Sequence, residues 1–191
     1  MTDAVSICNL ALQRLGTKTI SSLSEDTTAG RACNRIYTHA RDSELRAHPW
    51  SFARTRVKIA ADSTDPVFGY NKRYAIPSNS LRILPTNGSE STDLQDDWQI
   101  EGRFILTDSG SPINLIYIKR VTDESVFDES FVALLAARIA LDVVEQVTQS
   151  NTKKAAAERH YKIVQQEARR VNAFERPPQV TPTDSWVLAR L

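Results

Sequence analysis

The sequence has few of the residues on which common catalytic and metal-binding motifs depend: 6 glycines, 2 cysteines and 3 histidines among 191 residues. It contains no glycine-rich phosphate loop, no dinucleotide fingerprint and no G-x-S-x-G nucleophile elbow. Cys8, Cys33, His39 and His48 lack the close paired spacing of a zinc site, such as C-x-x-C. We therefore expect no catalytic residues, no metal and no cofactor, and a protein that is not an enzyme.

The sequence also lacks a large excess of charge and a long hydrophobic run. A formal net charge of +1 gives no overall basic field to attract nucleic acid, and no acidic field to attract a basic partner. The longest apolar segment, 131–147, is interrupted by Arg138, Asp142 and Glu145, which makes it too polar for a membrane span. The two cysteines fall on apolar faces of predicted helices, which favours reduced thiols and a cytosolic origin.

Hydrophobic spacing predicts two helices in the first quarter of the chain. Residues 4–15 repeat apolar positions at intervals of three and four, with Thr2 as the expected N-cap and Gly16 just after the end. A second helix with a similar apolar face is expected to be capped by Ser24 or Asp26.

The second helix leads into residues 41–53, Arg-Asp-Ser-Glu-Leu-Arg-Ala-His-Pro-Trp-Ser-Phe-Ala, which join it to a strand pattern. Pro49 disfavours the α conformation in the residue before it and cannot continue the hydrogen-bond ladder, so the helix should stop at about Ala47. Trp50 and Phe52 follow at this hinge. They are either packing residues where two subdomains meet or a specific aromatic site, and we expect packing.

Two further helices are predicted in the last third of the chain. Residues 129–148, capped by Asp128, are apolar on nearly every side and should form the most buried helix. A fourth helix starts at Ser150 or Asn151 and is charged except for a narrow seam, formed by Ala157, Tyr161, Val164, Ala168 and Val171. The short connection makes these two helices antiparallel neighbours, so we expect a four-helix core.

Between the second and third helices the pattern changes to short strands. Residues 54–59 alternate cations with β-forming residues, and further strands are predicted at 73–76, 81–84, 97–100, 104–106 and 113–120. The connections are too short for crossover helices, so we expect an α+β fold with an antiparallel β meander inserted between helices two and three. Two long polar loops, 62–70 and 86–96, are expected at exposed tips.

The chain end is predicted to be an extended C-terminal tail, 174–191, because Pro177, Pro178 and Pro182 prevent a long helix. The tail carries an apolar cluster around Trp186, which either folds back on its own domain or binds a partner. The rest of the chain is expected to divide into a first helical part, an inserted β subdomain and a second helical part: 1–53, 54–122 and 123–173.

Basic residues interleaved with aromatic ones suggest an alternative function. A stacking platform with phosphate contacts would use Arg46, Trp50, Phe52, Arg54, Arg56 and Lys58, then Tyr70, Lys72, Arg73 and Tyr74. Such a platform predicts a nucleic-acid-contacting module without catalytic activity. The near-neutral charge argues against high affinity, because affinity for nucleic acid grows with the number of phosphates that are neutralised.

Several motifs, in order and spacing, resemble the tail tubular protein A family, the head-to-tail adaptors of short-tailed bacteriophages. They are Ile7 to Leu12 with Leu15-Gly16, Ile20 to Leu23, residues 41–53, Tyr74 to Pro77 with Leu81 to Ile83, Phe131 to Ala140, and Ser185 to Arg190. The resemblance implies a structural virion protein that forms a dodecameric ring beneath the portal and closes the DNA-filled head. It also implies a surface for the tail nozzle, a tail tubular protein B-like partner, and a role similar to that of tail accessory factors.

On this resemblance we expect portal binding by the tail and ring contacts by helices two and four. The residues expected to bind the portal are Trp186, Val187, Leu188 and Arg190, and those expected in the ring are Arg31, Arg35, Tyr161, Val164 and Arg169. Mixed charge near neutrality suits a protein that packs beside copies of itself. We expect a monomer in the host cytoplasm before assembly, passing contact with packaged DNA in the virion, and no membrane.

Overall fold

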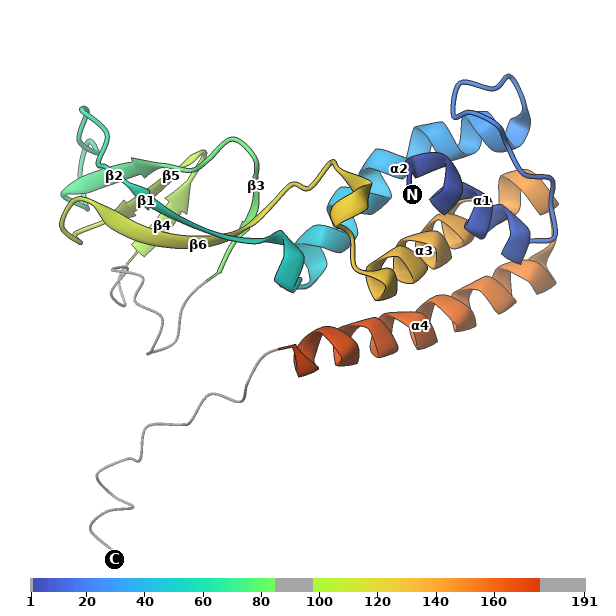
Figure 1. Ribbon diagram of the computed structural model, residues 1–191. Helices are drawn as coiled ribbons and strands as arrows, with labels where there is room; N and C mark the ends of the chain where they lie inside the picture. Colours follow the sequence, from blue (N-terminus) through green and yellow to red (C-terminus); the bar gives the residue numbers. More distant parts are fainter. Residues whose placement is uncertain (1, 85–97, 176–191) are drawn as a thin grey trace, which may run out of the picture.

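The computed structural model describes residues 2–84 and 98–175, and within them the chain is an α+β protein. This part of the chain forms four α-helices and two antiparallel sheets of three strands each. The helices gather at one end of the molecule and the strands at the other (Figure 1). The predicted α+β class is therefore confirmed, and the described strands all fall between the second and third helices in the sequence.

The helices follow the predicted ranges closely, as α1 (Ala4–Arg14), α2 (Thr28–Ala47), α3 (Glu129–Thr148) and α4 (Asn151–Phe174). Asp128 caps α3 and Ser150 caps α4, as the sequence predicts. Gly16 follows α1 with a φ of 65°, the left-handed conformation expected just after a helix end.

The N-caps of α1 and α2 differ from the predicted ones. Asp3, not Thr2, caps α1, because its carboxylate accepts from the Ser6 N–H at 2.7 Å while the Ser6 hydroxyl accepts from the Asp3 N–H. Thr27, not Ser24 or Asp26, caps α2 by accepting from a backbone N–H of the first turn. At both sites two neighbouring side chains can each cap a helix, Thr2 and Asp3 before α1 and Asp26 and Thr27 before α2. Helical spacing alone does not choose between such neighbours.

The helical core is built around α3, which contacts all three other helices. In Figure 1 this helix runs between α1 and α2 on one side and α4 on the other. Its side chains are buried around most of its circumference, including Leu134, Leu135 and Ile139, as the sequence predicts. Cys8 and Cys33 are free thiols inside the same core.

The strands form two separate antiparallel sheets. One has the order β1 (Arg54–Ile59), β6 (Ile113–Lys119), β3 (Ser80–Ile83), and the other β2 (Lys72–Ala75), β5 (Phe104–Thr107), β4 (Trp98–Glu101). The first register pairs Val57 with Leu115, and the second pairs Tyr74 with Ile105. Tyr74 and Leu115 belong to a small apolar cluster of their own, apart from the helical core.

The single meander that the sequence predicts is not confirmed. A meander pairs consecutive strands, whereas β6, the last strand, lies between β1 and β3. Among the described strands only β4 and β5 are both consecutive and paired. Period-two patterning identifies strands but does not show which distant strand each one pairs with. The predicted strand ranges are therefore close to the observed ones, whereas the predicted strand order is not.

The hinge places its aromatic rings inside the protein. The α2 helix ends at Ala47, before Pro49, as predicted. Trp50 is 1% exposed and donates from Nε1 to the Glu44 carbonyl at 2.9 Å. Its ring and that of Phe52 both lie 5.1 Å from the ring of Phe131 on α3. The packing interpretation of the hinge is confirmed, because these rings join the strand entry to the helical core.

Candidate interaction surfaces

Metal sites and membrane-spanning helices are the first features to consider among the described residues. Within 2–84 and 98–175, no group of three or more histidine, cysteine, aspartate or glutamate side chains is placed to hold a metal ion. In the same ranges, every helix is too short or too polar to cross a membrane. We take as candidate functional features the surfaces at which large apolar side chains are exposed.

A buried polar network fixes α4 against α2 and α3. Glu44 is only 2% exposed, and its Oε1 accepts from the Tyr161 hydroxyl at 2.7 Å and lies 3.5 Å from an Arg138 nitrogen. Arg138 also donates to Asp142 at 2.9 Å, one turn further along α3. Burial, followed by the Glu44 carboxylate, raises the pKa of Tyr161. The network is structural, because each of its charged groups has a partner of opposite charge.

The residues predicted for ring contacts divide into two groups. Arg31, Arg35 and Arg169 are exposed, and Arg31 forms an ion pair with Asp26. Val164 is buried in the helical core, and the Tyr161 hydroxyl donates a hydrogen bond to Glu44 of the same chain. The predicted seam of α4 therefore largely packs on its own chain, and within this set only the arginines are exposed to a neighbour.

The outer face of α4 carries exposed apolar side chains, of which only Val171 belongs to the predicted seam. Ile163, Val171 and Phe174 are all exposed. Val171 follows Ile163 by eight residues and Phe174 follows it by eleven. This spacing places all three side chains within one quarter of the helix circumference. Arg170 lies over the Phe174 ring at 5.6 Å. The helical spacing of Ile163 and Phe174 is visible in the sequence, but the stripe through Val164 is more regular. Val164 and Ala168 of that stripe are buried in the helical core.

The loop at 62–70 also exposes apolar side chains. Val67 and Phe68 are 96% and 87% exposed, although the loop reads as polar from its composition. Its base is fixed, because Asp62 Oδ1 accepts from Arg73 and from the Thr64 N–H, both at 2.9 Å. These bonds, first the one from Thr64, lower the pKa of Asp62. The loop therefore presents an apolar tip on an ordered base beside a hollow of about 310 Å³.

Two of the four aromatic rings predicted for the stacking platform are not accessible to a base. Trp50 and Tyr74 are buried, and the Tyr74 hydroxyl donates to the Ser109 carbonyl at 2.9 Å. Arg56 and Lys58 are exposed along β1. These two cations can contact phosphates, but Trp50 and Tyr74 cannot stack on a base.

Two predicted features fall outside the described residues. These are the loop 86–96 and the portal-binding residues Trp186, Val187, Leu188 and Arg190. No protein-family model matches the sequence, and no curated protein matches it. The candidate interaction surfaces are therefore the exposed apolar side chains on α4 and on the loop 62–70.

Proposed function

We propose that this protein is a structural head-to-tail adaptor of a short-tailed bacteriophage, forming a ring between the portal and the tail nozzle. The observation that carries the proposal is the placement of exposed apolar side chains on two different parts of the molecule. One set lies on the outer face of α4, and the other at the tip of the loop 62–70. An adaptor needs contacts of this kind toward several neighbours, whereas a lone enzyme needs one concave site.

In this proposal the helical part, 1–53 with 123–173, packs beside its copies and the inserted β subdomain, 54–122, faces the tail nozzle. Ile163 and Phe174 on α4, with Arg31, Arg35 and Arg169, make the ring contacts. The tail residues Trp186, Val187, Leu188 and Arg190 bind the portal. The resemblance of the hinge, the alanine-rich helix and the last residues to the tail tubular protein A family supports this division of roles.

Portal binding tests the role of the tail. Rings of the portal protein from the same phage are mixed with the full chain and with a truncation after Arg176, and co-sedimentation is measured. We expect the full chain to bind as a ring and the truncation to lose at least tenfold in affinity. Equal binding by both chains would show that the tail is not the portal contact, and no binding by the full chain would contradict the adaptor proposal itself.

Ring formation tests the outer face of α4. We expect Ile163→Glu to remain a folded monomer and to fail to assemble on portal rings, because it places a charge inside an apolar contact. Lys162→Glu is the matched control, since it adds the same side chain one position away on a different side of the helix. Assembly by both variants would remove α4 from the ring interface.

A direct measurement of DNA binding separates this proposal from the alternative. An adaptor monomer should bind duplex DNA weakly at physiological salt, because few of its cations are grouped. Tight, salt-sensitive binding of the isolated chain, lost in Arg56→Gln with Lys58→Gln, would instead favour the nucleic-acid module.

A further inference from the structure

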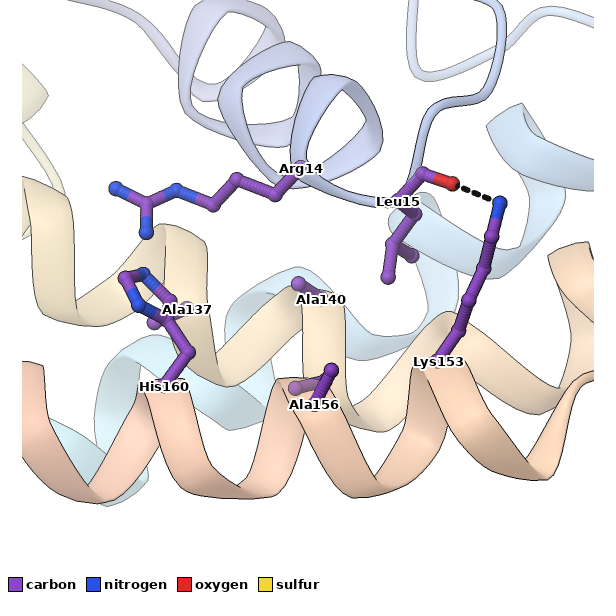
Figure 2. Close-up of a pocket in the computed structure, with 8 residues that line it drawn as sticks. Arg14, Leu15, Ala137, Ala140, Lys153, Ala156 and His160 are labelled. Carbon is purple, nitrogen blue, oxygen red and sulfur yellow. Dashed lines mark hydrogen bonds between the residues drawn. The ribbon is translucent and has the colours of Figure 1, made fainter.

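A second cavity, of about 290 Å³, lies among the helices. Its walls come from the end of α1, the middle of α3 and the first half of α4 (Figure 2). Much of its lining is alanine methyl groups, from Ala137 and Ala140 on α3 and from Ala156 and Ala157 on α4. The cavity is close to the lower size limit of small-molecule sites, about 300 Å³, and it offers an apolar wall to a short aliphatic group.

The polar groups around this cavity are basic. Arg14, Lys153 and His160 line it, and the described residues of its lining include no carboxylate. The Arg14 side chain is exposed at the end of α1, and no described residue forms an ion pair with it. Lys153 Nζ donates to the Leu15 carbonyl at 2.6 Å, which uses one of its three N–H groups. Two positive charges therefore border a cavity whose described lining carries no negative charge.

His160 points toward the Arg14 guanidinium from α4 (Figure 2). Its Nε2 atom is buried and has no hydrogen-bond partner in the part of the chain that the structure describes. Buried polar atoms in native proteins are nearly always paired, so an unpaired nitrogen beside a cavity indicates a group that the bare chain does not contain. A carboxylate between Arg14 and His160 would pair with both.

We propose that this cavity binds an alkyl carboxylate, with the charged group between Arg14 and His160 and the aliphatic stem against the alanine wall. The basic lining selects an anion, and the methyl groups favour an anion on a carbon chain over inorganic phosphate, which would leave them uncovered. The site does not depend on the adaptor role. Its ligand is a free short-chain acid or the acidic side chain of a second copy of this protein, because both present the same chemistry.

Titration of the full chain with butyrate, followed through the His160 ring resonances by NMR, tests the site. We expect a saturable shift with butyrate and none with butylamine or phosphate, in a buffer that contains neither carboxylate nor phosphate. Arg14→Gln should weaken butyrate binding at least tenfold, whereas Lys162→Gln, with the same loss of charge elsewhere on α4, should not change it. Ala156→Leu should also weaken binding, because the larger side chain occupies the cavity mouth from an exposed helix position.

A second arm distinguishes the two sources. If the acid comes from another copy, the same resonances shift as protein concentration rises without butyrate, the particle size increases, and butyrate reverses both changes. If butyrate binds and the spectrum is independent of protein concentration, the ligand is a free acid. The proposal is overturned if butyrate causes no saturable shift, if phosphate competes equally, or if Arg14→Gln binds butyrate as well as the unaltered chain does.

Discussion

The helical part and the β part of this protein bury their side chains in different ways. One apolar cluster runs through all four helices and includes Trp50 and the full length of α3, whereas the sheets share a much smaller cluster centred on Tyr74 and Ile105. The sheet end also leaves Val67 and Phe68 almost fully exposed. Most of the stabilising burial therefore lies in the helices, while the β end supplies a surface.

The largest test of this contrast removes one aromatic ring from each part. We expect Trp50→Ala to lower the free energy of unfolding by about 3–5 kcal/mol, because it leaves a cavity among buried rings and removes the bond to Glu44. Phe68→Ala should change it by less than about 0.5 kcal/mol, because that ring is exposed. Urea denaturation followed by circular dichroism measures both.

The outcome also separates stability from assembly. Trp50→Ala should assemble poorly because a smaller fraction of it is folded, whereas Phe68→Ala should stay stable and lose only the contact made by the loop. A Trp50→Ala protein that kept its stability but failed to assemble would make the hinge a binding site rather than packing. In that case the contrast between a stabilising part and a contacting part would be wrong.

A smaller effect is expected from the buried charges of the helical part. Glu44→Leu keeps a similar volume but removes the acceptor for Tyr161 and the partner of Arg138. We expect a loss of about 2–3 kcal/mol in unfolding free energy, because buried polar groups are left unpaired. Glu145→Leu removes only the exposed pair with Lys154 and should be unchanged within error. Equal effects would mean that Glu44 is better hydrated than its burial indicates.

Glycine to alanine substitutions give a further contrast between the two parts. In most helices this change stabilises by about 1 kcal/mol. At Gly30 in α2, however, the added Cβ would lie 2.5 Å from the Glu25 carbonyl oxygen, a backbone atom. We therefore expect Gly30→Ala to destabilise the protein by about 1–2 kcal/mol. Gly110→Ala, in the β part, meets nothing within 4 Å and should be nearly neutral. Thermal unfolding of the two variants measures the difference in stability.

Patterns local in the sequence predict local structure well here. The end of α2 at Ala47 follows from the Pro49 break, the start of α3 at Glu129 from the Asp128 cap, and the first strand at 54–59 from its period-two pattern. The strand order does not follow, because β6 pairs with strands more than thirty and fifty residues earlier in the chain and nothing in its own pattern identifies them.

Surface features were harder to predict than the core. Val67 and Phe68 sit in a loop whose other residues are typical of turns, and the exposure of two adjacent apolar side chains depends on how Arg73 and Asp62 close the loop base. The cavity beside His160 joins residues of α1, α3 and α4, from Arg14 to His160. A site assembled across such separations is visible only once the helices are packed.

The smallest expected effect is a difference in acid sensitivity between the two parts. The pKa of His160 is lowered first by burial and then by the positive charge of Arg14, with Lys153 on the same cavity wall. The folded state therefore binds a proton at His160 less readily than the unfolded state, whose value is about 6.5. This contribution to stability is complete above pH 6.5 and is lost as the pH falls below it.

The pKa of Asp62 in the β part is also lowered, by hydrogen bonds from Thr64 and Arg73. The contribution of this carboxylate to stability is therefore present above about pH 3.8, the ordinary aspartate value, and is lost only in stronger acid. Unfolding free energies measured from pH 7 to 3 should thus fall less steeply below 6.5 for His160→Gln than for the unaltered chain. Asp62→Asn should alter the curve only near and below pH 4. If both variants altered the curve over the same pH range, burial would not be what lowers the pKa of His160. A fully hydrated imidazole binds its proton equally well in the folded and unfolded states, so it does not change stability with pH.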